Sequence, residues 1–525
     1  MLINNLKKNI IFIYSLILFF FSIFFNQYYG YIGIFPEDSF LIFNSGYDTL
    51  NGYFPFKDYW TTTGPLLDLI QALFFKIFGI NWSSYVLHAS VFNFIITIST
   101  FFVLLKFNLK INYCFFYSLL VAVLSYPNAG TPFMDHHSNI LSTLSLFLFI
   151  LAIKNKSNYY WFFLPILLGL SFLSKQVPAS YVGLIIAFLS IFYFIFNFDI
   201  KKIFSGIFGS LFFIITFIIV IKLADISLRS FYEQYILFPK SMGHDRLNLL
   251  LPLEFNRIIL KFKLIHLSLF FIIFVIIKNI ITNYNYLKSN EFLILTSLVA
   301  YAFSLIITQL MTINSKYIFF IIPILVGFSH IYSEKYFNKK KYILFFLISL
   351  SFASTAWYHF NYNATRKFMD LEKYNINNAV EAKILNENFN QLKWITVINP
   401  NNPNEEMMNL KKNIEIIKND LRKKTIVTDY QFISVFFDSY DFSPNRVWHG
   451  GANYPQIGHE YFEIYKKFFI DKLIENKIQV IYTIKPLWGD DNVLKTILSE
   501  NCYTTEKISD TLDRQVILPC DDLKI

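Results

Sequence analysis

Carboxylates are concentrated in a short stretch near the N-terminus, between Phe35 and Gln71. An acid beside a bilayer must be hydrated, paired or bound to a metal. A positioned carboxylate can also accept a proton from a nucleophile and stabilise developing positive charge. The stretch follows a first apolar run and is punctuated by glycines, so we predict a chemically active loop. Its acids are Glu37, Asp38, Asp48, Asp58 and Asp68.

The adjacent pair Glu37 and Asp38 is the strongest candidate for acid–base chemistry in this loop. We predict Asp38 as the general base, with Glu37 as the neighbouring alternative. The competing interpretation of Asp38 is a solvated acid at a helix end, because exposed loop acids are common. Asp48 and Asp58 are weaker candidates, and Asp68 can simply cap or pair within a juxtamembrane helix.

The sequence Asp135-His136-His137 forms a second candidate group. With Asp38 across a cleft, Asp135 and His137 would offer three ligands to a divalent ion. Oxygen ligands with one imidazole suit Mg²⁺ or Mn²⁺, so the cofactor prediction is one of these ions, or otherwise none. The alternative is that Asp135 caps a helix beginning near Asn139, with the histidines at the membrane interface.

Three cations are placed where they can reach an anionic lipid head group. Lys175 and Lys316 lie at the ends of apolar runs, where an ammonium can meet a phosphate as a point charge. Arg246 can hold a phosphate bidentately. The alternative for each lysine is snorkelling, which is routine near helix ends. The predicted substrate-binding set is Lys57, Asp58, Lys175, Arg246, Lys316 and Tyr317.

A membrane is the scaffold that these residues need. Of 525 residues, 55% are hydrophobic, 20% aromatic and 16% charged, which is more apolar surface than one or two soluble cores can bury. Apolar runs of bilayer length predict about eleven transmembrane helices. The first follows Lys7 and Lys8 but lacks a cleavage site, so it is predicted to be retained. The spans are 9–28, 84–105, 113–126, 139–153, 159–173, 178–196, 203–223, 264–281, 292–311, 317–332 and 342–360.

Lysines at alternate connections between the spans predict the orientation. The N-terminus and its lysines are expected in the cytoplasm, as the positive-inside rule requires. An odd number of spans then places everything after residue 360 in the periplasm or another extracytoplasmic space, with the plasma (inner) membrane as the location. The net charge of +10 is explained by these anchors, and no nucleic-acid partner is expected.

The composition changes after residue 360, where apolar runs shorten to strand length. We predict a helical membrane domain over 1–360, with its first outward loop at 30–83, and a soluble α/β domain over 361–525. Strands are expected at 425–437, 479–484 and 515–520, with a helix at 461–476. No glycine-rich phosphate loop follows these strands, so a nucleotide site is unsupported. Cys502 and Cys520 can form a disulfide or stay free.

Motifs on the predicted outward side occur in a characteristic order between residues 10 and 360. After the acid pair come a G-x-x-P-x-x-D pattern (Gly52, Pro55, Asp58) and a Gly-Pro-Leu turn at 64–66. A lysine turn follows at 169–180, and then a Lys-Tyr…Pro segment at 316–323. In this order the motifs resemble the polytopic GT-C glycosyltransferases of the protein-mannosyltransferase and aminoarabinose-transferase type (glycosyltransferase family 39-like).

The acid pair departs from the pattern of these enzymes. Their usual order is Asp-Glu, whereas this chain has Glu37 followed by Asp38. Counting back from Gly52 favours Asp38 as the equivalent of the leading aspartate, with Glu37 as the alternative. The residues after 360 match only in being an outward soluble domain.

The resemblance implies a cell-envelope enzyme that moves a hexosyl or pentosyl group from a polyprenyl-phosphate donor. The acceptor would be a lipid, glycan or protein on the outer face of the membrane. Such a transfer passes through an oxocarbenium-like state, which a carboxylate such as Asp38 stabilises. The alternative is a flippase or transporter of lipid-linked sugars, which would more often carry ionisable residues near the bilayer centre. The identities of the transferred sugar and of the acceptor stay open.

Overall fold

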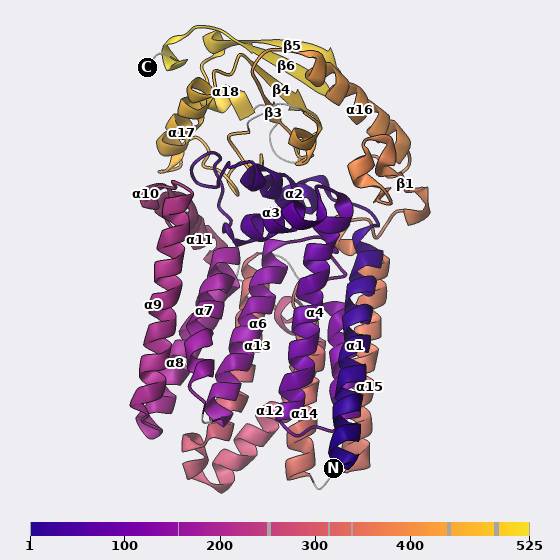
Figure 1. Ribbon diagram of the computed structural model, residues 1–525, viewed down its shortest axis with the longest axis vertical. Helices are drawn as coiled ribbons and strands as arrows, with labels where there is room; N and C mark the ends of the chain where they lie inside the picture. Colours follow the sequence, from indigo (N-terminus) through magenta and orange to yellow (C-terminus); the bar gives the residue numbers. More distant parts are fainter. Residues whose placement is uncertain are drawn as a thin grey trace. The chain divides into compact units, whose positions relative to one another are not determined.

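The chain is mainly helical and ends in a small sheet (Figure 1). The computed structural model describes residues 2–155, 157–248, 254–312, 316–337, 340–437, 443–487 and 493–523. Contacts divide the chain into two compact units. Unit 1 comprises Met1–Gly30, Val86–Ile218 and Asp245–Phe368, and unit 2 comprises Tyr31–Tyr85, Ile219–His244 and Met369–Ile525. The first long loop therefore shares a unit with the C-terminal part, whereas the prediction divided the chain at residue 360.

Unit 1 is built from apolar helices, and each predicted span coincides with one helix. Within the described residues, eight helices are long and apolar enough to cross a membrane, so the chain is an integral membrane protein. The prediction of about eleven spans also counted α5, α7 and α14, which are shorter. The helices are α1 (Leu2–Gly30), α4 (Trp82–Lys106), α5 (Ile111–Leu124), α6 (Met134–Lys154), α7 (Tyr159–Ser174), α8 (Gln176–Phe196), α9 (Ile200–Leu223), α12 (Lys263–Thr282), α13 (Asn290–Met311), α14 (Ile321–Tyr336) and α15 (Lys341–Tyr358).

Close backbone packing fixes the turn that precedes α6. Gly130 has a φ of +78°, and a Cβ atom there would lie 2.5 Å from the Cα of Gly30 at the end of α1. Only glycine meets both demands without strain. The Asn26 side chain of α1 donates a hydrogen bond to the Gly130 carbonyl at 3.1 Å. The turn that leads to Asp135 is thus held against α1.

In unit 2 the stretch predicted as a loop is largely helical, which corrects the prediction. It forms α2 (Pro36–Leu50) and α3 (Leu66–Phe78). Proline in the first turn and acids beside it favour a helix start, because proline needs no amide partner there and acids complement the helix dipole. The backbone before α2 pairs with the C-terminal part, since the amides of Gly33 and Ile34 donate to the carbonyls of Lys393 and Ile395 at 3.0 and 3.1 Å.

The C-terminal part of unit 2 carries a four-stranded sheet in the order β3-β4-β6-β5. β3 (Lys424–Val427) and β4 (Val480–Ile484) are parallel, while β6 (Leu512–Ile517) is antiparallel to β4 and to β5 (Tyr503–Ser509). Phe469 of helix α17 (Phe462–Glu475) belongs to the same buried apolar cluster as Val427 of β3 and Ile481 of β4. The predicted α/β character is confirmed, and β4, α17 and β6 lie close to their predicted positions.

Three features of this part differ from the prediction. The strand expected over 425–437 ends at Val427, and a 3₁₀ turn follows at Ile433–Phe436. Strand β5 and helix α16 (Pro403–Asn419) were not predicted. Sequence patterns miss β5 because its side chains are mostly exposed, so it has no apolar alternation. Outside this part, the segment between the predicted spans 203–223 and 264–281 contains α10 (Leu228–Tyr232) and α11 (Phe238–Asn248), and its residues 249–253 lie outside the described residues.

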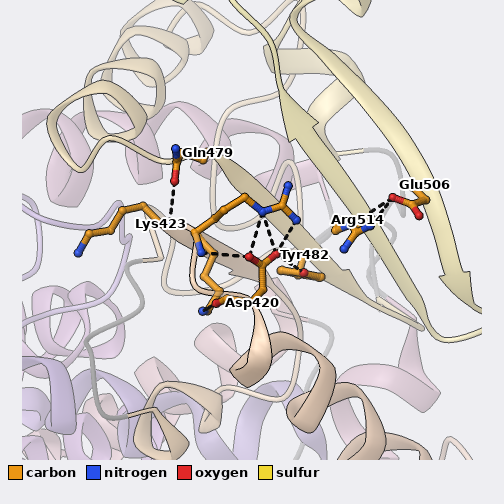
Figure 2. A network of polar contacts seen from close by, with 8 residues as sticks. Asp420, Lys423, Gln479, Tyr482, Glu506 and Arg514 are labelled. Carbon is orange, nitrogen blue, oxygen red and sulfur yellow. Dashed lines mark hydrogen bonds and ion pairs between the residues drawn. The ribbon is translucent and has the colours of Figure 1, made fainter.

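A polar network joins the end of α16 to the sheet (Figure 2). Asp420 accepts hydrogen bonds from the Arg422 guanidinium at 2.6 Å and from the Tyr482 hydroxyl at 2.6 Å. These donors, Arg422 first, hold the pKa of Asp420 well below its usual range. Farther along the sheet, Arg514 pairs with Glu506 at 2.6 Å. The structure also pairs Cys502 with Cys520 in a disulfide, which settles an alternative that the sequence left open.

Candidate functional site

The first turn of α2 presents Glu37 and Asp38 together. Proline at position 36 starts the helix, and the Ser39 hydroxyl oxygen accepts a hydrogen bond from the Phe35 amide at 2.9 Å. The Tyr85 hydroxyl donates to the Ser39 carbonyl at 2.8 Å. Acids in this position are favoured by the positive end of the helix dipole. The helix start therefore holds both carboxyl groups at one place in unit 2.

Aromatic packing on the next turns of α2 fixes its position against the C-terminal part. The Phe40 ring lies 4.5 Å from the Phe432 ring, between centroids, and the Phe43 ring lies 5.2 Å from that of Tyr85. Such pairs are worth about 0.5–1.5 kcal/mol each beyond their buried area. Rings of Trp82, Phe389 and Trp394 complete this contact.

Burial and neighbouring acids govern the protonation of Glu37. Burial, then the charges of Asp38 and Asp429, raise the pKa of Glu37 to about 9. Glu37 therefore keeps its proton at neutral pH and is a poor base there. Asp38 is left as the base candidate of the pair.

Asp429 is a member of this site that the sequence prediction missed. It is buried and lies two residues beyond the end of β3. The missed signal is an acid at the carboxyl end of a buried parallel strand, which is a usual place for ligand-binding residues in α/β sheets. The strand predicted over 425–437 places this position in its interior, whereas β3 ends at Val427.

A buried arginine holds α2 and α3 to the C-terminal part. The Arg446 guanidinium forms an ion pair with the Asp68 carboxylate, and both side chains are almost fully buried. Arg446 also donates to the Ser45 hydroxyl of α2 at 2.8 Å and to the Thr63 hydroxyl. The Tyr59 hydroxyl donates to Asp68 at 3.3 Å. Asp68 was predicted to cap or pair within a juxtamembrane helix, and the structure gives it this long-range partner instead.

The other acids of the first loop have partners within a few residues, and its lysine has a distant one. Asp48 accepts a hydrogen bond from the Asn44 side chain at 3.0 Å. Asp58 accepts from the Phe54 amide at 2.7 Å, and burial raises its pKa. Lys57 pairs with Asp225 at 3.2 Å. The role of Lys57 and Asp58 in substrate binding stays a prediction.

In unit 1, Asp135 pairs with Lys175. Their side chains meet at 2.6 Å, with Asp135 buried and Lys175 partly buried. Helix α6 begins at Met134, its N-cap position is Phe133, and no side chain caps it. The alternative interpretation, that Asp135 caps a helix starting near Asn139, is therefore wrong. The acid lies inside the first turn, and a lysine from the connection after α7 neutralises its charge there.

His137 uses both of its ring nitrogens within the protein. Its Nδ1 contacts the Tyr126 hydroxyl, and its Nε2 lies 2.9 Å from Nε2 of His88. Over the ranges that the structure describes, no group of three His, Cys, Asp or Glu side chains is arranged to hold a metal ion. The third predicted ligand, Asp38, belongs to unit 2. The metal site made of Asp38, Asp135 and His137 stays a prediction, and Asp135 and His137 already have other partners.

The remaining predicted cations also lie in unit 1. The Lys316 carbonyl accepts from the Asn128 side chain at 2.6 Å, and its ammonium lies 5.9 Å from the centre of the Phe368 ring. The adjacent Tyr317 is buried, with its ring 5.1 Å from that of His136. Arg246 is partly buried in α11. Residues 313–315 of the turn before Lys316 lie outside the described residues.

Arg366 is a second buried arginine that the sequence prediction missed. It lies just after α15, and its guanidinium donates to the carbonyls of Pro127 and Ala129 at 2.9 and 3.2 Å. Burial lowers its pKa to about 10, so it stays charged at neutral pH. Its carbonyl partners belong to the turn that leads into α6 and Asp135. Arg366 therefore positions this turn.

Comparison with known proteins gives a structural match. No model of a known protein family matches the sequence, and no curated protein matches it. Among solved structures, the chain is similar to the crystal structure of ArnT from Cupriavidus metallidurans bound to undecaprenyl phosphate. The TM-score is 0.50 with 10% sequence identity, and the match covers 97% of each chain. The predicted GT-C fold, a polytopic helical bundle with a C-terminal α/β part, is thereby confirmed.

Proposed function

We propose, from the GT-C fold of the chain, that it is a membrane glycosyltransferase. It would move a hexosyl or pentosyl group from a polyprenyl-phosphate donor to a hydroxyl or amine of a lipid, glycan or protein. The observation that carries this proposal is the pair Glu37 and Asp38, held at the first turn of α2, where burial and the charges of Asp38 and Asp429 raise the pKa of Glu37. The similar ArnT structure, which is bound to undecaprenyl phosphate, supports the choice of donor.

The proposed reaction assigns different roles to the two acids. Asp38 accepts the proton of the acceptor's hydroxyl or amine while the acceptor's oxygen or nitrogen bonds to the anomeric carbon of the sugar. The bond between that carbon and the phosphate oxygen breaks, and polyprenyl phosphate leaves. The Asp38 carboxylate also stabilises the oxocarbenium-like charge. Protonated Glu37 carries no charge, so it does not compete for the proton.

The phosphate leaving group is proposed to meet cations of the predicted set. Lys316 and Arg246 are the first candidates. Lys175 would act as part of its pair with Asp135, which leaves less net charge for a phosphate. Lys57 and Tyr317 complete the proposed contacts. No step is routed through a metal ion.

The proposed orientation places the N-terminus in the cytoplasm and the C-terminal part in the periplasm, in the inner membrane. Its support is the alternation of lysines between the spans. A reporter that works only outside the cytoplasm should be active when it is fused after Ile525. Activity of a cytoplasm-only reporter at this position would overturn the orientation.

The function itself is tested with purified protein in detergent. The protein is incubated with a panel of polyprenyl-phosphate hexoses and pentoses and with lipid, glycan and peptide acceptors. Transfer of sugar, absent from protein-free micelles, is the expected result. No vectorial transport is possible in micelles. Absence of transfer with every donor, combined with movement of lipid-linked sugar across protein-containing vesicles, would establish the flippase alternative instead.

A further inference from the structure

A small cavity lies in the C-terminal part of unit 2, and neither acid of the α2 pair lines it. Its volume is about 160 Å³. It lies beside Tyr430, three residues after β3, and Lys485, directly after β4. These two strands are parallel, so their carboxyl ends open at the same edge of the sheet. Ligands of α/β folds bind preferentially at this edge.

Helix α16 forms one wall of the cavity, and its buried face carries polar side chains among apolar ones. The buried positions of this helix are mostly apolar, but Glu406 and Asn413 interrupt them. Both side chains line the cavity, with Leu410 between them. Burying polar groups costs free energy unless they are paired. These two side chains give the open volume a polar wall on the side of α16.

The two groups differ in the hydrogen-bonding capacity that their partners leave, since both carboxyl oxygens of Glu406 are already engaged. The Glu406 carboxyl oxygens accept from Thr396 at 2.6 Å and from Tyr430 at 2.9 Å, and burial raises the Glu406 pKa. The Asn413 amide nitrogen donates to the Thr511 hydroxyl at 3.0 Å, and that contact does not use its carbonyl oxygen. The exposed Asn409 adds a second amide at the rim.

The charge of the lining selects a neutral ligand. Lys485 is the one cation among the described residues that line the cavity, and Asp513 pairs with it at 2.6 Å. A phosphate would lack an unpaired cation here. Amides and a carboxyl suit vicinal hydroxyls, while Leu410, Ile484 and Pro486 offer an apolar surface to the C–H face of a ring. Drug-sized pockets are larger, about 300–1,000 Å³, so the space suits one ring.

We propose that this cavity binds a single neutral sugar unit, either free or at the end of a glycan. The choice of a sugar rests on the proposed function, since a glycosyltransferase meets sugars on its acceptor. The site would then hold an acceptor glycan, or retain its end, away from the acid pair. Glu406 and Asn413 would contact its hydroxyls, and Asn409 would close the rim.

The test is binding of monosaccharides to the full-length protein in an amine-oxide detergent, which has no sugar head group to compete. Saturation-transfer NMR is measured with neutral hexoses, pentoses and N-acetyl sugars, and inorganic phosphate is the anionic probe. We expect at least one neutral sugar to bind and phosphate not to compete with it. Binding by no neutral sugar, or displacement of the sugar by phosphate, would overturn the proposal.

Variants on α16 locate the site. Asn409→Ala, at an exposed position, removes one hydrogen bond and should weaken binding about five- to tenfold without unfolding the protein. Asn413→Leu should abolish binding, with its folding checked by thermal melting. Asn404→Leu, a matched change on an exposed part of the same helix, should leave binding unchanged. Sugar binding that survives both Asn409→Ala and Asn413→Leu would contradict the assignment.

The result of the sugar-binding test can be told apart from the result of the transfer test of the proposed function. Binding is measured without a lipid donor, so a protein that transfers no sugar can still bind one here. Asp38→Asn should leave this binding unchanged, because Asp38 does not line the cavity. A loss of sugar binding in Asp38→Asn would instead place the bound sugar at the acid pair and overturn the second site.

Discussion

The guanidinium of Arg446 and the carboxylate of Asp68 form a buried ion pair that joins the C-terminal part of unit 2 to α3 of the first long loop. Hydroxyls of Ser45 and Thr63 accept from the same guanidinium. Helix α2, which carries Glu37 and Asp38, is thus held by an arginine from the other end of the chain. The C-terminal part therefore helps to position the acid pair.

Removal of Arg446 should strongly destabilise the protein. Arg446→Met leaves Asp68 buried without its partner, which we expect to lower the free energy of unfolding by about 3–5 kcal/mol. The double variant Arg446→Met/Asp68→Leu should recover much of this loss, because no isolated charge remains. Arg422→Met is the control, since its pair with Asp420 is partly exposed and worth about 1 kcal/mol or less. Unfolding in detergent is the measurement, and a double variant no more stable than the single one would contradict the account.

Glu37 should make stability depend on pH. Its pKa rises from 4.5 to about 9 on folding, so the folded state binds the extra proton between these values. The contribution of Glu37 is then fully present below pH 4.5 and is lost as the pH rises towards 9. Glu37→Gln should flatten the fall in stability over this window, whereas Glu405→Gln, an exposed control, should not. Identical pH profiles for wild type and Glu37→Gln would refute the raised pKa.

The disulfide should contribute measurably to the stability of the C-terminal part. Cys502 and Cys520 are 18 residues apart in the sequence. A disulfide that closes a loop of this length raises the free energy of unfolding by about 2–4 kcal/mol. Cys502→Ser should lower the unfolding free energy by this amount, and a reductant should have the same effect on wild type. Cys114→Ala, which removes the unpaired cysteine, should leave the response to the reductant intact. An unfolding free energy of the wild type that does not change in a reductant would contradict the pairing.

Sugar transfer should persist in a chelator. Asp135 is paired with Lys175, and both ring nitrogens of His137 contact Tyr126 and His88, so neither side chain is ready to bind an ion. Turnover is compared with and without EDTA after extensive dialysis. Activity that is lost in EDTA and restored by Mg²⁺ or Mn²⁺ would favour the predicted site of Asp38, Asp135 and His137 over this account.

Local patterns were sufficient to predict most of the helices. An apolar run of bilayer length excludes other structures, because every backbone group in lipid must be paired internally. The start of α6 was misplaced because Asp135 and His137 read as polar loop residues. Hydropathy does not reveal that Lys175 neutralises Asp135. It also does not reveal that His137 forms hydrogen bonds with His88 and Tyr126.

The site was only partly predictable from the sequence. The sequence singles out Glu37 and Asp38 because they follow the first predicted membrane span. Asp429 and Arg446 escaped because their partners lie hundreds of residues earlier in the chain, and no periodicity of a short segment reports such contacts. The helix α2 was missed as well, since glycines and acids suggested a loop. Its start signal, Pro36 with two acids, was present.

The central claim is that Asp38, and not Glu37, is the base of a sugar transfer. Glu37→Gln is the matched control, because it replaces a carboxyl that already holds its proton. The measurement is turnover of both variants with a polyprenyl-phosphate sugar, after confirming that each protein is folded and binds donor. We expect Asp38→Asn to reduce turnover by about 10²-fold or more, the usual effect of losing a general base, and Glu37→Gln to reduce it by less than about tenfold. Near-normal turnover in Asp38→Asn, with loss in Glu37→Gln, would contradict the account.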